Sequence, residues 1–210
     1  MIKAIFKFFL TFLSLNAFSQ IEKPALAIYI SPLQTIGVDP TLTFGTEIVF
    51  ESSQSLLLSY GYGSKEIFKD NRNLAAHKFG IGYKKFLKEL SINQKGGIYW
   101  GTEYVYKKAL QGTTAHKLDE QSSNPTSLEY IVNVNVHALR MKLGATFFPQ
   151  IFPYVDASFG LGLKYFDNYN QNLPNGFGFS TPTMYNRLAS TGIAPSINLD
   201  IKAGLGFWKK

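Results

Sequence analysis

The chain has 210 residues, a formal net charge of +7, no cysteine and a mean hydropathy of −0.03. Without cysteine it is neither a disulfide scaffold nor a lipid-anchored lipoprotein. After residue 15 no run approaches the roughly 18 consecutive apolar residues of a membrane helix. A mean hydropathy near zero does not count against a membrane barrel, because strands that alternate between a lipid face and a polar interior average out to such a value. If the chain spans a membrane, it does so as a closed barrel.

Residues 1–19 are typical of a secretory signal peptide. Lys3 and Lys7 precede an apolar stretch over residues 8–15, and the small residues of Ala17-Phe18-Ser19 lead to a cleavage point ahead of Gln20. The apolar stretch is too short to span a bilayer. Its removal leaves a net charge of +5 on the single domain 20–210. That charge is modest for nucleic-acid binding, so no nucleic-acid partner is expected.

The first three predicted strands alternate residue by residue between apolar side chains and small or polar ones. Ala25–Ser31 ends before Pro32, which cannot donate to a β-ladder. Thr41–Glu51 follows, and a tight turn near Ser52-Ser53-Gln54 leads to Ser55–Gly63. The apolar face comprises Leu26, Ile28, Ile30, Leu42, Phe44, Ile48, Phe50, Leu56, Leu58, Tyr60 and Tyr62.

A polar segment over residues 64–74 separates these strands from a fourth, Ala76–Phe86. After a connection over 87–96, a fifth strand is predicted from Ile98 to Lys107. Its apolar face has aromatic residues at its ends, and its other face carries glycine and charge. Residues 108–127 are hydrophilic and are expected to form an exposed loop.

The sixth predicted strand, Leu128–Phe147, changes phase along its length. Its apolar residues occupy even positions through Val136 and odd positions from Leu139, which predicts a β-bulge near His137 and Ala138. A seventh strand alternates without interruption from Val155 to Tyr165. A second long loop is expected over 167–190, before the last strand, Ser196–Trp208.

Eight antiparallel strands of roughly 9–11 residues account for the mature chain as an all-β, up-and-down transmembrane barrel. Ten strands require another hairpin within 167–190. Connections after strands one, three, five and seven are polar and mostly long, whereas those after two and six are short. Outer-membrane barrels keep short turns in the periplasm, so both termini are expected there. Two aromatic rims are predicted, one from Tyr83, Phe86, Trp100, Phe147, Tyr154 and Phe207 and the other from Tyr60, Tyr62, Tyr104, Tyr106 and Tyr165.

Ten charged residues of the predicted strands lie opposite the apolar faces. An eight-stranded interior is just wide enough for side chains to fill it. These charges are therefore expected to pair into a network that plugs the barrel, with an ion pathway as the alternative. They are Glu47, Lys78, Lys84, Glu103, Arg140, Lys142, Asp156, Lys164, Asp200 and Lys202.

The signal peptide, the eight alternating strands and the terminal Leu205-Gly206-Phe207-Trp208 resemble the small outer-membrane β-barrel proteins of Gram-negative bacteria. The resemblance covers Ala25 to Trp208. It implies residence in outer-membrane lipid, with Phe207 and Trp208 as the C-terminal signal read by the barrel-assembly machinery. Lys209 and Lys210 follow this pair, whereas the usual terminal residue of the class is Phe.

The sequence predicts neither an enzyme nor a cofactor or metal site. Its four Gly-x-Gly triplets continue strands, so they are expected to make room inside the barrel. The histidines lack metal-ligand spacing. We expect a structural or interaction role through the segments 64–74, 108–127 and 167–190, with an unidentified partner. The alternatives are an outer-membrane acyl hydrolase or transferase using His137 or His77, and a secreted lipocalin-like carrier with an apolar interior.

Overall fold

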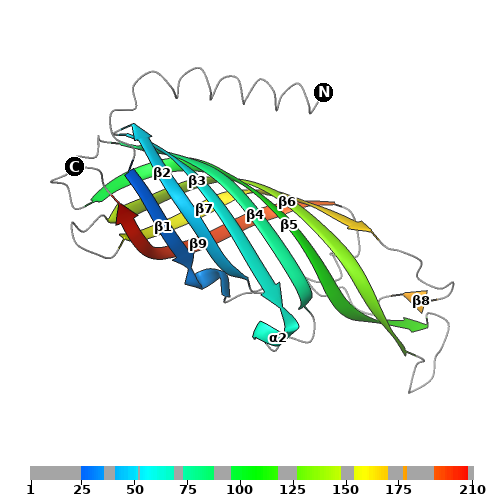
Figure 1. Ribbon diagram of the computed structural model, residues 1–210. Coiled ribbons are helices and arrows are strands. Elements are labelled where there is room, and N and C mark those ends of the chain that lie inside the picture. The colour runs from blue at the N-terminus through cyan, green and yellow to red at the C-terminus, as the bar shows by residue number, and fades with distance from the viewer. Residues whose placement is uncertain are drawn as a thin grey trace.

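A computed structural model of the chain describes residues 25–35, 41–51, 53–68, 73–87, 96–117, 127–147, 154–169, 177–178 and 192–207. Nearly all of them lie in strands (Figure 1). The strands are β1 (Ala25–Ser31), β2 (Leu42–Glu51), β3 (Gln54–Ser64), β4 (Asn73–Phe86), β5 (Gly96–Lys117), β6 (Ser127–Phe147), β7 (Tyr154–Tyr169), β8 (Phe177–Gly178) and β9 (Gly192–Phe207). A 3-10 turn, η1 (Pro32–Thr35), follows β1, and one helical turn, α2 (Lys65–Phe68), follows β3.

The sheet closes on itself as an eight-stranded antiparallel barrel. β1 to β6 each pair with the next strand along the chain, and β9 pairs with both β7 and β1. The pairing of β4 with β5 completes the ring. The two-residue β8 lies outside it and adds to the far end of β5. The prediction of a closed, all-β, up-and-down barrel of eight strands is confirmed.

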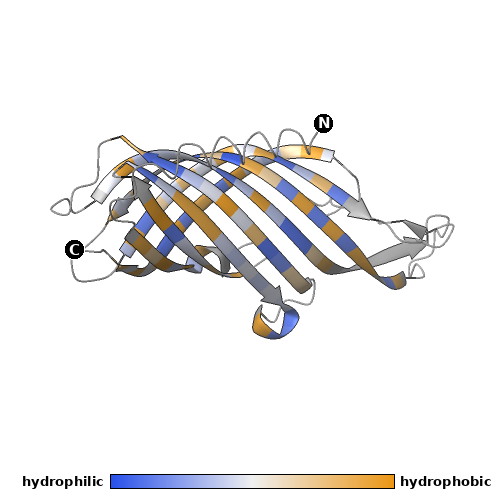
Figure 2. Cartoon of the chain, turned by 45° about the horizontal axis from the view of Figure 1, so that its top comes forward, coloured by the Kyte–Doolittle hydropathy of each residue, from blue (hydrophilic) through white to orange (hydrophobic). Residues whose placement is uncertain are grey.

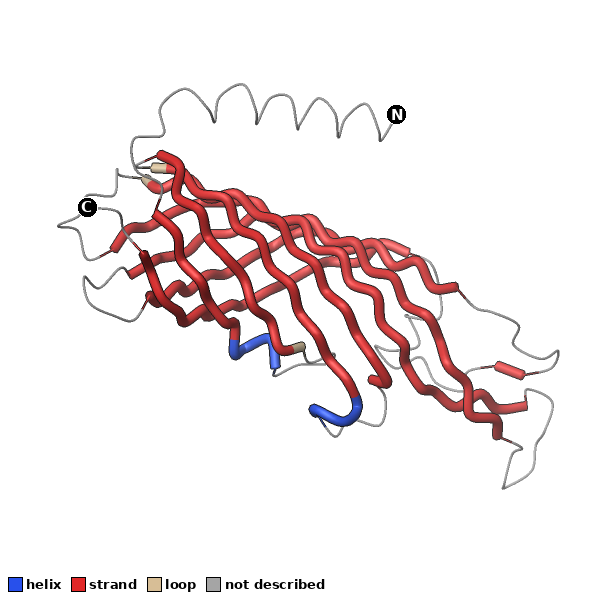
Figure 3. The backbone as a smooth tube through the Cα atoms, in the orientation of Figure 1, coloured by secondary structure: helices blue, strands red, loops and turns tan. Residues whose placement is uncertain are grey.

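The pairing register gives the tilt of the strands. A row of directly paired residues that starts at Ile193 of β9 runs round the whole barrel and returns to β9 at Ala203, ten residues further on. A stagger of ten over eight strands corresponds to a tilt of roughly 40° from the barrel axis. The tubes of Figure 3 run obliquely for this reason.

The two faces of the wall differ sharply in polarity. Side chains alternate between hydrophobic and hydrophilic along each strand (Figure 2). Large apolar side chains point outward and are exposed, among them Ile28, Phe44, Phe79, Leu139, Leu161, Ile197 and Leu205. Charged side chains point inward and are buried, among them Glu47, Lys84, Asp156 and Lys202. Within the described ranges no helix has the length and apolar character to cross a membrane.

The β5–β6 hairpin is much longer than predicted. Residues 108–117, expected in a loop, belong to β5, and 108–116 pair with the first part of β6. β4 accompanies β5 only to Gln111, and β7 accompanies β6 only to Asn133, so the end of the hairpin projects beyond both neighbours (Figure 1). The prediction was wrong because pairing with the β-prone start of β6 outweighs the hydrophilic composition of this segment.

The predicted bulge in β6 is absent. The pairing of β6 with β5 and β7 is continuous through His137 and Ala138. Val132 and Val134 instead face the interior, on the same side as the buried Ala138. The phase change in the sequence therefore reflects apolar side chains that move from the inner to the outer face along β6, with no change of register.

Several predicted features fall outside the described residues. These are the signal peptide, most of the segment 167–190, much of the connection 87–96, and Trp208 of the C-terminal signal. Phe207, the other residue of that signal, ends β9, points outward and is paired with Leu26 of β1.

Candidate functional site

The centre of the barrel is organised around Lys84 of β4. Its Nζ lies 2.7 Å from Oε2 of Glu47 on β2 and 2.6 Å from Oδ2 of Asp156 on β7. Both carboxylates have no exposed surface. One ammonium thus joins strands from opposite sides of the ring, which requires a narrow and filled lumen.

The ion pairs continue from Asp156 as a chain of alternating sign. Lys202 Nζ lies 3.2 Å from Asp156 Oδ1 and 3.7 Å from Asp200 Oδ2. The chain then passes through Lys142, whose Nζ lies 3.6 Å from Asp200 and 2.9 Å from Glu103, to Arg140, 3.3 Å from Glu103. It comprises the carboxylates Glu47, Asp156, Asp200 and Glu103 and the cations Lys84, Lys202, Lys142 and Arg140.

Hydroxyl groups donate further hydrogen bonds to three of these carboxylates, Glu47, Asp156 and Asp200. Ser55 donates to Glu47 at 2.6 Å, and Thr146 donates to Asp156 at 2.6 Å. The hydroxyls that complete the set are those of Tyr154 on Glu47, Tyr99 on Asp156 and Ser31 on Asp200. Buried ions are tolerated only where such additional hydrogen bonds offset their desolvation. The sequence did not single out these donors, because serine, threonine and tyrosine are equally common on exposed strand faces.

A cluster of rings and apolar side chains packs against the ionic chain. It comprises Ala27, Tyr29, Leu57, Phe86, Tyr99 and Tyr154. Lys84 Nζ lies 4.4 Å from the centroid of the Tyr99 ring, and Lys202 Nζ lies 5.2 Å from that of Tyr29. Phe86 and Tyr154 were predicted in an outward rim, and this was wrong. Phe86 lies two residues after the inward Lys84, and Tyr154 lies two residues before the inward Asp156, so both side chains face the interior.

Glycines make room for the interior tyrosines. Tyr29 is directly paired with Gly45, and Tyr99 with Gly144. A Cβ on Gly144 would lie 2.5 Å from the Tyr99 hydroxyl oxygen, and one on Gly45 would meet the Tyr29 ring as closely. Because these glycines have no side chain, the tyrosine ring opposite each of them can pack against the backbone of the wall.

The other two predicted interior charges are Lys78 and Lys164. Lys78 occupies an inward position on β4, opposite Gly61 of β3 and Lys107 of β5. Lys164 lies on β7 with its Nζ 4.9 Å from the centroid of the Phe166 ring. The other eight are brought together as described above.

The two histidines considered as catalytic residues lie on the outer face of the barrel. Nδ1 of His77 lies 2.9 Å from the Tyr60 hydroxyl, and Nδ1 of His137 lies 2.8 Å from the Tyr104 hydroxyl. His116 lies near the end of β5, opposite Ser127 of β6. Among the residues described here, no three His, Cys, Asp or Glu side chains lie close enough together to hold a metal ion.

The chain was compared with protein-family models, with curated proteins and with solved structures. None of the three comparisons gave a match. What the barrel does is therefore argued from its geometry alone.

Proposed function

We propose that the protein is an integral outer-membrane β-barrel whose interior is closed to diffusion and whose projecting hairpin serves as an interaction surface. The observation that carries the proposal is the polarity of the wall, with large apolar side chains exposed outside and an ionic chain buried inside. A hydrocarbon environment stabilises that outer face, whereas water does not.

The extent of the apolar surface supports a lipid environment. One face-to-face row passes from Thr102 through Met141 and Leu161 to Ile197, and the rows on either side of it are also largely apolar. Soluble monomers rarely expose contiguous apolar patches larger than a few hundred Å². A lipocalin-like carrier would need the reverse arrangement, with apolar residues inside and charges outside.

A closed lumen is supported by the ionic chain and its hydroxyl partners. The chain draws on β2, β4, β5, β6, β7 and β9, so it ties together most of the ring. An open pore of this strand number would leave those carboxylates and ammonium groups without partners. The proposed protein is a rigid membrane anchor and not a channel.

Export and assembly complete the proposal. Residues 1–19 direct secretion, with cleavage near Ser19-Gln20, and the last strand carries the aromatic signal for the barrel-assembly machinery. Phe207 lies outward at the seam between β9 and β1, where the ring closes. The projecting end of the β5–β6 hairpin then lies on the extracellular side, beyond the lipid.

A catalytic role has less support. A lipid-modifying hydrolase needs a serine within reach of its histidine. The hydrogen bonds at Nδ1 of His77 and His137 are shared with tyrosine hydroxyls. Tyrosine hydroxyls fit an interfacial aromatic rim at these positions.

Three measurements test the proposal. In electrophoresis the unboiled protein is expected to migrate differently from the boiled one, and cell fractionation should place it in the outer membrane. In planar bilayers it should give no large, stable conductance. A soluble periplasmic protein without a mobility shift contradicts the membrane assignment, and a steady conductance contradicts the closed lumen.

A further inference from the structure

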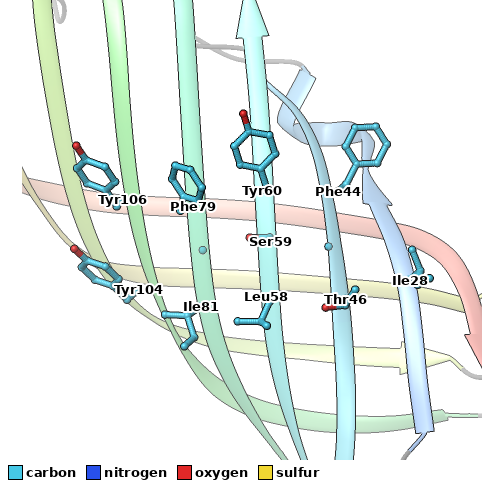
Figure 4. Close-up of a pocket in the computed structure, with 12 residues that line it drawn as sticks. Ile28, Phe44, Thr46, Leu58, Ser59, Tyr60, Phe79, Ile81, Tyr104 and Tyr106 are labelled. Atoms are coloured by element: carbon cyan, nitrogen blue, oxygen red, sulfur yellow. The ribbon is translucent and has the colours of Figure 1, made fainter. Parts of the chain in front are cut away.

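The outer face of β1 to β5 carries a groove that the interior network does not account for. Its volume is about 570 Å³, and it lies between two rows of outward side chains (Figure 4). The upper row is Phe44, Tyr60, Phe79 and Tyr106, and the lower row is Ile28, Thr46, Leu58, Ile81 and Tyr104. Each row follows directly paired residues from strand to strand.

The groove is mostly apolar, and four of its five aromatic rings lie in the upper row. Thr46 is the smallest outward side chain in its lower row. An elongated hydrocarbon chain fits such a surface, because it fills the space between the rows without requiring hydrogen bonds.

Polar and basic side chains lie just beyond the aromatic row. His77 of β4 is directly paired with Tyr62 of β3 and with Lys108 of β5, two positions past Phe79 and Tyr106. His77 and Lys108 are both exposed. Directly opposite residues have Cβ atoms about 5 Å apart, so one anion can meet both side chains.

Tyrosines hold the imidazole in place. The Tyr60 hydroxyl lies 2.9 Å from Nδ1 of His77, so an incoming ligand is met by Nε2. The Tyr62 ring lies 5.3 Å from the same imidazole, centroid to centroid. His77, at the basic end of the groove, is therefore positioned by tyrosines of the adjacent strand.

The next hairpin repeats this arrangement and fixes the other end of the aromatic row. The Tyr104 hydroxyl lies 2.8 Å from Nδ1 of His137, which is directly paired with Tyr106. The Tyr106 hydroxyl donates to Asn135 Oδ1 at 3.2 Å. Tyr106 thus borders the groove and is positioned by β6.

We propose that this groove binds a phosphate-bearing membrane lipid, with an acyl chain between the two rows and the phosphate on Lys108 and His77. The inference rests on the proposed membrane location, since the groove then faces the bilayer. A phosphate oxygen accepts charge-assisted hydrogen bonds from an ammonium group and an imidazole N–H. The apolar groove and the adjacent cations together match an anionic amphiphile.

Native mass spectrometry of the full-length refolded barrel, released from detergent micelles, tests the proposal. The probes are dimyristoyl phosphatidate and dimyristoylglycerol, which share their acyl chains and differ in the phosphate. We expect one phosphatidate to be retained at about tenfold lower lipid concentration than the glyceride. Glycerol phosphate, which has no acyl chain, should not be retained.

The variants separate the two parts of the site. Lys108→Ala and His77→Ala should each remove most of the preference for phosphatidate, and Thr46→Phe should weaken retention of both lipids by narrowing the groove. Lys85→Ala and Leu199→Phe are the matched controls, since both residues lie on the outer face but away from the groove. Neither control should alter retention. Each variant is first checked for the mobility shift of the folded barrel.

Three results would overturn the inference. Equal retention of the two lipids removes the role of the phosphate, and unchanged retention in Lys108→Ala and His77→Ala removes the role of these residues. If the barrel is a dimer and Thr46→Phe dissociates it, the groove is an interface between two copies of the chain and not a lipid site.

Insertion into vesicles is measured in parallel. Failure to insert overturns the membrane proposal as well, whereas insertion without lipid preference overturns the lipid site alone.

Discussion

Lys84 and Asp156 lie 72 positions apart in the chain, and their charged groups meet at 2.6 Å in the barrel interior. The same ammonium lies 2.7 Å from Glu47. These contacts are long-range in sequence and short in space, so they form only when the ring is closed. The contacts of Lys84 are therefore tied to closure of the barrel and not to any single hairpin.

Removal of the central cation should destabilise the folded barrel strongly. Lys84→Met keeps the length of the side chain but leaves two buried carboxylates without their shared partner, at an expected cost of about 3–5 kcal/mol. Urea unfolding in lipid vesicles, followed by the electrophoretic mobility shift, measures this cost. Lys85→Met is the control, because Lys85 is the next residue and is exposed on the outer face. Equal effects of the two substitutions would contradict the central role of Lys84.

A side chain at Gly144 should also destabilise the barrel, for a steric reason. A Cβ there lies 2.5 Å from the Tyr99 hydroxyl oxygen and 2.7 Å from the Ala157 carbonyl oxygen. Gly144→Val is therefore expected to cost about 1–3 kcal/mol in the same unfolding assay. Gly192→Ala, where a Cβ meets nothing within 4 Å, should be close to neutral. A Gly144→Val barrel as stable as the original would mean that Tyr99 does not lie against this wall.

The sequence contained enough to predict the barrel and the charges of its interior, but not how these charges pair. Strict period-two alternation over β7 and β9 predicts strands with two faces, and the charges at Asp156, Asp200 and Lys202 fall on the inward one. Which acid meets which base depends on the register across strands that are remote in sequence. That register, with its stagger of ten residues round the ring, is not encoded in any one segment.

The wrong predictions share a physical cause. The polarity of each segment taken alone predicts that β5 ends at Lys107 and that β6 contains a bulge, and both predictions are wrong. In the structure the start of β6 supplies pairing for residues 108–116, and its valines face the interior. Local composition does not carry that information, because it depends on the neighbouring strand.

A charge on the lipid-facing wall should be costly at mid-depth and tolerated at the rim. Leu161 is outward on β7 and directly paired with Met141 and Ile197, both exposed and apolar. Leu161→Arg is expected to lower the free energy of unfolding in vesicles by about 2–4 kcal/mol. Asp167→Arg, on the same face six positions along β7, should cost about 0–1 kcal/mol. Full tolerance of Leu161→Arg would contradict a lipid environment for this face.

The two ends of the barrel should be distinguishable by their accessibility in cells. Glu129 is exposed on the projecting part of β6, and Leu87 is exposed just after β4, at the opposite end of the strands. The chain has no cysteine, so Glu129→Cys and Leu87→Cys each introduce a single thiol. A membrane-impermeant maleimide should label Glu129→Cys on intact cells but Leu87→Cys only after the outer membrane is permeabilised, because long hairpins face outward and short turns face the periplasm. The opposite pattern would invert the topology. Equal labelling of both thiols on intact cells would contradict insertion, since no bilayer then separates the two ends.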